Sequence, residues 1–153
     1  MHKPSIVAVA AIMLGAGFTL PAGAEVAAED AAKYRQYIMR ALSGHNGAVS
    51  LIARAKAGDP GNVGKHTAAL VALAAEIGPA FEAAGGAPVE DTEALPAIWE
   101  RPADFAAAVE TFAAAVAALD AAAGGEDIAA VESAHRDVAA ACKGCHEDFR
   151  LDD

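Results

Sequence analysis

The sequence Cys142-Lys143-Gly144-Cys145-His146 decides how the rest of the chain is interpreted. Two cysteines separated by two residues and followed at once by a histidine are the pattern of a c-type haem attachment site. The two thiols can reach the two vinyl groups of one porphyrin, and the next imidazole can reach its iron. On a helix, residues three and four apart share a face, so Cys142, Cys145 and His146 can all point toward one ligand. The motif therefore predicts a helix that carries covalently bound haem c.

Other interpretations of the same residues remain open. A redox dithiol prefers a helix N-terminus, where the helix dipole stabilises the thiolate, but Cys142 and Cys145 lie near the end of a predicted helix. A closed zinc site would normally need a fourth ligand, and the sequence has no second paired motif. His146 could also be a solvated histidine in the last helical turns. Haem attachment accounts for all three residues at once and is favoured.

Length and charge limit the class of protein. The 153 residues suffice for one domain with a sizeable core, and the alanine-rich, aromatic-poor composition favours helices over strands. The chain has 21 acidic and 11 basic residues, giving a formal net charge of -10. Such an acidic surface argues against nucleic acid and against anionic lipid as partners, and it would suit a basic redox partner protein.

Residues 1–24 have the pattern of a cleavable secretory signal peptide. His2 and Lys3 form a short basic start, residues 6–20 are mostly apolar, and residues 22–24 have the small-residue pattern of a cleavage site. The rival interpretation is a membrane span, but the apolar stretch is short. We expect a periplasmic mature domain of residues 25–153 with no membrane span. Export agrees with haem attachment, because thioether bonds would consume two cysteines that could otherwise form a disulfide.

Hydrophobic periodicity predicts four helices. The expected segments are 28–57, 63–84, 102–123 and a last helix from 126 through the haem motif. Gly78-Pro79 predicts a kink or break in the second helix near Ile77, because proline removes a backbone bond and clashes with the preceding turn. Residues 87–101 are expected to form a long irregular connection, with Ile98 and Trp99 anchoring it to the core as packing residues. The fold class is all-α, an antiparallel four-helix bundle.

The first and last helices each carry a long stripe of residues expected to face the core. In the last helix the stripe includes both cysteines, so a haem attached there would lie inside the bundle. His45 and His135 fall on these stripes and are expected to be core histidines, whereas His66 carries no readable signal. The stripes comprise Tyr34, Ile38, Ala41, His45, Ala48 and Ile52 in the first helix and Ile128, Val131, His135, Val138, Cys142, Cys145 and Phe149 in the last.

Taken together, the sequence resembles the cytochrome c prime family, the class II c-type cytochromes. The resemblance rests on Tyr34-Arg35-Gln36 with Met39, on Thr-Glu-Ala-Leu-Pro-Ala-Ile-Trp at 92–99, and on Ala-Cys-Lys-Gly-Cys-His-Glu-Asp-Phe-Arg at 141–150. It covers nearly all of the mature chain. The family's members are four-helix bundles with the haem motif near the C-terminus.

The resemblance implies a role for each of six residues. Cys142 and Cys145 would hold the haem, His146 would be the proximal iron ligand, and Arg150 would cover the proximal side. The face shared by Arg35 and Met39 would cross the distal side, with Arg35 near a propionate and Met39 over the iron. The alternatives are a surface position for Arg35, a frayed terminal position for Arg150 and a packing role for Met39.

The resemblance leaves two functions open. If Met39 bonds the iron, the site is six-coordinate and low-spin and suits a periplasmic carrier of single electrons. If Met39 only packs, the iron is five-coordinate and could bind nitric oxide or carbon monoxide. No residue is expected to be catalytic, because the distal side offers no evident acid or base. Family members are often dimers through their first two helices, and the sequence leaves a homodimer open.

Overall fold

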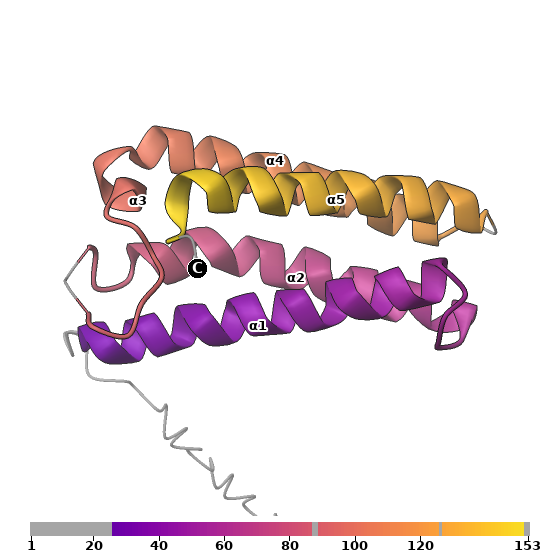
Figure 1. The fold of residues 1–153 in the computed structure, drawn as a ribbon, viewed down its shortest axis with the longest axis horizontal. Coiled ribbons are helices and arrows are strands. Elements are labelled where there is room, and N and C mark those ends of the chain that lie inside the picture. The colour runs from indigo at the N-terminus through magenta and orange to yellow at the C-terminus, as the bar shows by residue number, and fades with distance from the viewer. Residues whose placement is uncertain (1–25, 87–88, 126, 152–153) are drawn as a thin grey trace, which may run out of the picture.

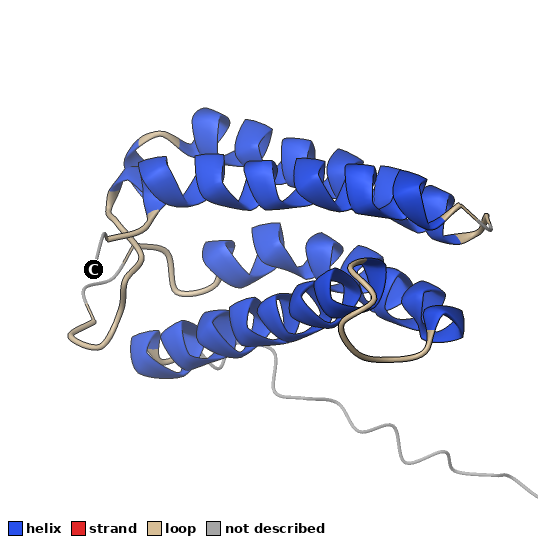
Figure 2. Ribbon diagram, turned by 45° about the vertical axis from the view of Figure 1, so that its right-hand side comes forward, coloured by secondary structure: helices blue, strands red, loops and turns tan. Residues whose placement is uncertain are grey.

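The computed structural model describes residues 26–86, 89–125 and 127–151. Four long helices run antiparallel: α1 (Ala28–Ala53), α2 (Val63–Glu82), α4 (Pro102–Ala123) and α5 (Ile128–Phe149). A 3-10 turn, η1 (Pro60–Asn62), precedes α2, and a short helix, α3 (Ala97–Glu100), lies between α2 and α4 (Figure 1). The described residues form no strand, so the all-α four-helix bundle is confirmed (Figure 2). The expected signal peptide lies outside the described residues.

The helices pack mainly as sequence neighbours. The contacts of α1 with α2, of α4 with α5 and of α2 with α4 are extensive, whereas α1 and α5 touch over a smaller area. The core between them contains Val49, Leu70, Val116, Leu119 and Val138, each with no exposed side-chain surface. Among the pairs of neighbouring long helices, α1 and α5 therefore have the smallest interface.

The first helix ends at Ala53, four residues earlier than expected. Ala55 has a φ of 53° and Gly58 a φ of 88°, which is the left-handed conformation that ends helices. A Cβ on Gly58 would lie 2.7 Å from Cγ1 of Ile52, so glycine is needed at this turn. The turn therefore begins inside the segment that the hydrophobic pattern assigned to the helix.

Of the kink or break expected in α2 at Gly78-Pro79, the break is wrong, because the helix continues to Glu82 with Pro79 inside it, whereas the kink stays a prediction. Pro79 lies in the last turn and removes one backbone hydrogen bond, the one that an N–H at this position would donate to the carbonyl of Ala75. Ile77 and Phe81, on either side of the proline, are buried in the core. Their packing holds the helical conformation where the local preference alone predicts a break.

The connection after α2 is more ordered than expected, because residues 97–100 form α3. The expected anchor is confirmed: Ile98 is 4% exposed, and Nε1 of Trp99 donates a hydrogen bond to the carbonyl of Phe81 at 2.9 Å. Pro102 begins α4, where its missing N–H costs nothing. Asp127 caps α5 by accepting from the N–H of Ala129 at 2.9 Å.

Two residues of the predicted stripes are exposed. Tyr34 is 48% exposed and donates to Glu76 of α2 at 3.4 Å, so it covers the outer edge of the α1–α2 pair. Ile128 is 42% exposed, because it is the first residue of α5 and lies at the end of the bundle.

The expectation that no segment of the mature domain is long and apolar enough to cross a membrane is wrong: by length and composition alone α4 is, because an 18-residue window of this helix has a mean hydropathy of 1.6.

Candidate cofactor site

A cavity of about 700 Å³ is lined by residues of α3, of the end of α5 and of the other long helices. Figure 1 shows that α3 and the end of α5 lie at the same end of the bundle. All four long helices, α3 and residues 91–94 contribute to its wall. This volume is in the range of small-molecule and cofactor sites. The larger apolar side chains of the wall are Leu42, Leu70, Ile77, Phe81, Ile98, Phe105, Val109, Phe112 and Phe149.

The structure brings all of the predicted site residues to this one cavity. The α1 helix contributes two of them and α5, with the residue that follows it, contributes four. The residues are Arg35 and Met39 from α1 and Cys142, Cys145, His146 and Arg150 from the end of α5.

The haem motif lies in the last two turns of α5, with Cys142, Cys145 and His146 each half-buried on the side that faces the cavity. Neither cysteine forms a disulfide. Burial raises the pKa of both thiols, and at Cys145 the nearby Cys142 and Asp148 raise the pKa further. A raised pKa keeps the thiols protonated, which is the opposite of what a reactive redox dithiol requires.

The imidazole of His146 is held in its neutral form. Burial lowers its pKa, the charge of Arg150 lowers it further, and Glu93 opposes these two effects. A neutral imidazole has a free nitrogen lone pair, which is the form that binds a metal ion. The charge state of His146 therefore suits iron ligation.

The side chain of Arg35 is 4% exposed, so the surface alternative for this residue is wrong. Its Cζ lies 5.4 Å from the ring centroid of Phe81 and 5.5 Å from that of Trp99, and Nη1 donates to the carbonyl of Ala83 at 3.5 Å. Burial lowers the pKa of the guanidinium. Within the part of the chain that the structure describes, no carboxylate pairs with this cation, so an anion inside the cavity would be its natural partner.

Arg150 is held in place, which contradicts the frayed-terminus alternative. Its backbone N–H donates to the carbonyl of His146 at 3.0 Å, and Nε lies 3.4 Å from a carboxylate oxygen of Glu93. The backbone around it pairs with the connection: the N–H of Leu95 donates to Phe149 at 3.0 Å, and the N–H of Leu151 donates to Glu93 at 2.8 Å. This short antiparallel pairing ties the end of the motif helix to the cavity wall.

Sequence reasoning missed the role of residues 91–94, which form part of the cavity wall. Nε2 of Gln36 donates to the carbonyl of Asp91 at 2.7 Å and so holds this segment against α1. The family resemblance at residues 92–99 was the one signal in the sequence that could have indicated this role. Asn46 also lines the cavity, and its buried Oδ1 has no hydrogen-bond partner.

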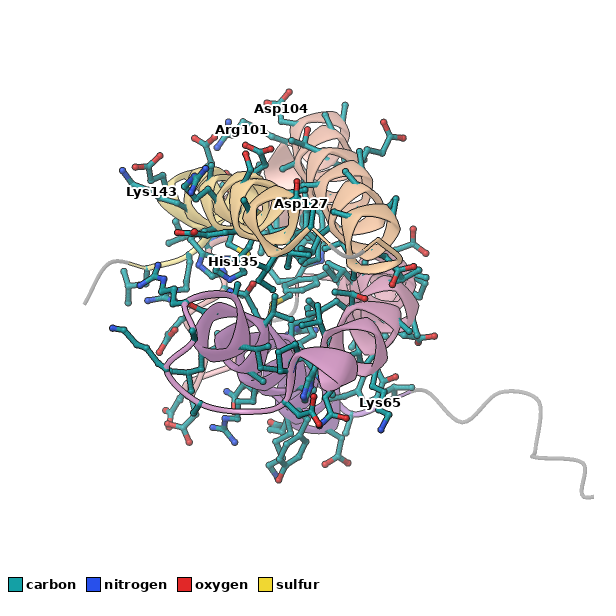
Figure 3. The ribbon with its side chains drawn as sticks, turned by 90° about the vertical axis from the view of Figure 1, so that its right-hand side faces the viewer. Lys65, Arg101, Asp104, Asp127, His135 and Lys143 are labelled. Carbon is teal, nitrogen blue, oxygen red and sulfur yellow. The ribbon has the colours of Figure 1, made fainter. Side chains whose placement is uncertain are left out.

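The three other described histidines, His45, His66 and His135, lie outside the cavity wall. His135 is 6% exposed and lies on the side of α5 that faces α1, so its assignment to the core is confirmed, although its Nε2 has no partner (Figure 3). His45 is half-buried and contacts His66 of α2 across the α1–α2 interface.

These residues fit a c-type haem. Two protonated thiols and a neutral imidazole share one wall of the cavity, a thioether lies in the opposite helix, and a buried cation without a carboxylate partner is available for an acidic substituent. Among the described residues, no group of three or more histidine, cysteine, aspartate or glutamate side chains could hold a metal ion. That result argues against the zinc alternative for the two cysteines.

Known proteins share this arrangement of sequence and fold. The family model described as Cytochrome C' matches residues 30–150. Cytochrome c-554 of Cereibacter sphaeroides is 47% identical over 92 residues, an alignment that covers 59% of this chain and only 60% of that relative. Cytochrome c' of Rubrivivax gelatinosus is 37% identical over 126 residues, which cover 79% of this chain and 94% of that relative.

Solved structures of cytochrome c′ share the fold of this chain. The crystal structure of the Rubrivivax gelatinosus protein has a TM-score of 0.72 at 38% identity and covers 79% of this chain and 94% of its own. A nitric oxide complex of a variant of cytochrome c prime from Alcaligenes xylosoxidans has a TM-score of 0.72 at 31% identity, with coverage of 81% and 96%. The chain thus belongs to the cytochrome c′ family and carries iron in covalently bound haem c.

Proposed function

We propose that this protein is a periplasmic carrier of single electrons, in which Cys142 and Cys145 anchor the haem and His146 is the proximal iron ligand. The bound haem supplies an iron that gains and loses one electron. The protonated thiols are stable until they are consumed by thioether bonds, and the neutral imidazole presents its lone pair. The cavity wall beside these groups is mostly apolar.

The observation that carries the proposal is the position of Met39. Its side chain lines the same cavity as His146, but from α1 rather than α5, and it is half-buried. A thioether and an imidazole on opposite helices are the pair of axial ligands typical of electron-carrying c-type cytochromes. We infer that Met39 is the sixth ligand, which gives a site that changes little in geometry when its charge changes.

The two arginines have supporting roles in this proposal. The buried guanidinium of Arg35 would pair with a haem propionate, because the cavity is where a carboxylate could reach it. Arg150 would fix the proximal side through its bond to the carbonyl of His146 and its ion pair with Glu93. Neither residue, nor any other side chain of the cavity wall, is proposed to be catalytic.

A second candidate function is the capture of nitric oxide or carbon monoxide. The apolar wall that surrounds Met39 would favour small neutral ligands if the sulfur did not occupy the sixth position. Structures of cytochrome c prime from Alcaligenes xylosoxidans contain nitric oxide in one case and carbon monoxide in another. Gas binding at an open site requires Met39 to be a packing residue.

The proposal includes the compartment of the protein and its partners. Export by residues 1–24 would place the mature chain, residues 25–153, in the periplasm, where haem c is attached. The acidic composition, with 21 acidic and 11 basic residues, would favour a redox partner with a basic docking face. Pairing of two copies through α1 and α2 is the form of homodimer that the family resemblance suggests.

Optical spectra with and without carbon monoxide test the choice between the two functions. The purified protein should be low-spin in both oxidation states and should not bind carbon monoxide readily. Met39→Leu conserves volume, so packing should cost less than about 1.5 kcal/mol, and the variant should become high-spin and bind the gas. Ile38→Leu is the control, because Ile38 is buried on the same helix but does not line the cavity.

Two outcomes would decide against parts of this proposal. A high-spin spectrum of the unmodified protein would favour gas capture over electron transfer. A protein that loses its pigment on denaturation, or whose mass is that of the polypeptide alone, would show that Cys142 and Cys145 do not hold the haem.

A further inference from the structure

A shallow groove lies on the surface of the bundle between α4 and α5, which run side by side (Figure 1). Its lining consists of small residues: two alanines and Thr111 from α4, and two alanines, Gly144, a cysteine and two aspartates from α5. Ala108, Ala141 and Cys145 line both this groove and the haem cavity. One layer of side chains therefore separates the haem cavity from the surface at this place.

Cys145 connects this groove to the cofactor. Its sulfur is one of the two that we assign to the haem, so in the haem-loaded protein a single side chain would join the porphyrin to the groove. The rate of electron transfer falls steeply with the distance between donor and acceptor. A redox protein bound in the groove would therefore be well placed to exchange electrons with the haem.

The groove is acidic. Asp137 and Asp148 are its two charged lining residues, and no lysine or arginine contributes to the lining. Arg101, just before α4, partly balances one end, because its guanidinium lies 3.8 Å from the carboxylate of Asp148 and 3.4 Å from that of Asp104. Asp137 forms no ion pair within the described part of the chain. Three carboxylates and one guanidinium leave an excess of two negative charges at the groove.

The lysine of the haem motif does not reverse this charge. Lys143 lies on the side of α5 that is turned away from α4 (Figure 3), and its amine is 3.4 Å from a carboxylate oxygen of Glu147. The negative potential of the groove would attract a basic protein surface. It would repel a second copy of this chain, which carries the same charge.

The small side chains of the groove suit a contact that forms and breaks quickly. Alanine and glycine lose no side-chain entropy when a partner covers them, so a small contact area is sufficient for binding. Ala140 and Gly144 are exposed, and no large apolar side chain lines the groove. Weak electron-transfer complexes typically have such small interfaces, below about 1,200 Å².

We propose that the groove between α4 and α5 is the surface through which this cytochrome exchanges electrons with a basic redox protein, and that Cys145 connects this surface to the haem. This role rests on the proposed electron-carrier function. In the exchange, one electron leaves the iron of the reduced protein and enters the oxidised centre of the other, and no atom is transferred.

The test measures electron transfer from the dithionite-reduced, haem-loaded protein, freed of excess reductant, to an oxidised basic class I cytochrome c by stopped-flow spectroscopy. Asp137→Lys should lower the second-order rate constant at least about fivefold at low ionic strength and less at high ionic strength. Ala140→Gln adds an uncharged side chain to the groove and should lower the rate constant about threefold or more at every ionic strength.

Glu82→Lys is the control, because it makes the same change of charge at an exposed residue of α2 that lines neither the groove nor the haem cavity. Its rate constant should lie within about twofold of that of the unmodified protein. Oxidation by benzoquinone, which is small and uncharged, should also stay within about twofold in all three variants. Circular dichroism establishes that each variant retains the bundle.

A second measurement detects docking without electron transfer. The ¹⁵N-labelled, oxidised protein is mixed with the oxidised basic cytochrome c and followed by nuclear magnetic resonance. The backbone amides of residues 111–115 and 137–144 should shift, whereas those of α1 should not.

Three results would overturn the proposal. Rate constants of Asp137→Lys and Ala140→Gln equal to that of Glu82→Lys would place the docking surface elsewhere. Amide shifts confined to α1 and α2 would assign docking to another face. Absence of electron transfer to the basic cytochrome, although benzoquinone oxidises the haem, would exclude a basic partner. A haem that neither oxidant can oxidise would instead contradict the proposed carrier function itself.

Discussion

The buried guanidinium of Arg35 offers the sharpest test of how the haem is oriented. The cation is 4% exposed, lies 5.4 Å and 5.5 Å from two aromatic rings, and has one long hydrogen bond of 3.5 Å to a carbonyl. Contacts with aromatic rings contribute about 0.5–2 kcal/mol each, which does not offset the several kcal/mol needed to bury an ion. A propionate beside Arg35 would provide the missing counter-charge.

The change to make is Arg35→Met, which removes the charge but keeps an unbranched side chain. An opposite charge within about 4–6 Å lowers the pKa of a carboxyl group by about 1–3 units, or about 1.4–4 kcal/mol. Removal of the guanidinium should raise the propionate pKa by that amount. The propionate charge acts on the iron, so the pH at which the reduction potential changes slope should move upward by about 1–3 units.

Spectroelectrochemical titration of the haem-loaded protein between pH 4 and 9 measures this shift. Arg35→Lys keeps the charge and should retain most of the original profile. Arg136→Met makes the same chemical change at an exposed arginine that pairs with Glu132 and does not line the cavity, so it should change nothing. If Arg35→Met leaves the inflection where it is in the unmodified protein, Arg35 does not pair with a propionate, and the proposed orientation of the haem is wrong.

Three further predictions concern stability and are measured by urea unfolding. Thr67 is fully buried and donates to Oδ1 of Asp120 at 2.5 Å, so Thr67→Val should lower the free energy of unfolding by about 1.5–3 kcal/mol; a loss below about 0.5 kcal/mol would contradict a strong hydrogen bond. Burial lowers the pKa of His135, so below about pH 6.5 the unfolded chain binds a proton that the folded chain does not. Stability should therefore fall with falling pH by up to about 1.4 kcal/mol per unit for this group, and His135→Leu should remove that slope, whereas an unchanged slope would exclude His135 as its source. Phe149 is 4% exposed and meets the ring of Phe105 edge-on at 5.3 Å, so Phe149→Ala should cost about 3–5 kcal/mol, and a much smaller cost would mean that the end of α5 is not fixed by this packing.

The sequence was most informative where function depends on local spacing. Cys142, Cys145 and His146 are close in the chain, and helical geometry alone brings them to one face. Arg35 and Met39 could be placed opposite them only through the family resemblance, because the approach of α1 to α5 is a tertiary feature. The apolar periodicity of the last helix predicted its inner face well, apart from its first turn.

The sequence was least informative where packing overrides local preference. Pro79 predicts a break, but the buried residues on either side keep α2 continuous. Tyr34 has the spacing of a core residue, yet the position of α2 leaves it 48% exposed. The close approach of His45 to His66 depends on the register of two helices, which no pattern within either helix specifies.

The connection between α2 and α4 has a consequence for how such a protein can change over time. Residues 91–94 belong to the cavity wall, yet their backbone is held by only a few bonds to α1 and to the end of α5. New side chains at these positions would alter the surroundings of the cofactor while leaving the helix interfaces untouched. Redox or gas-binding properties could therefore diverge between descendants of one bundle without any loss of its folding stability.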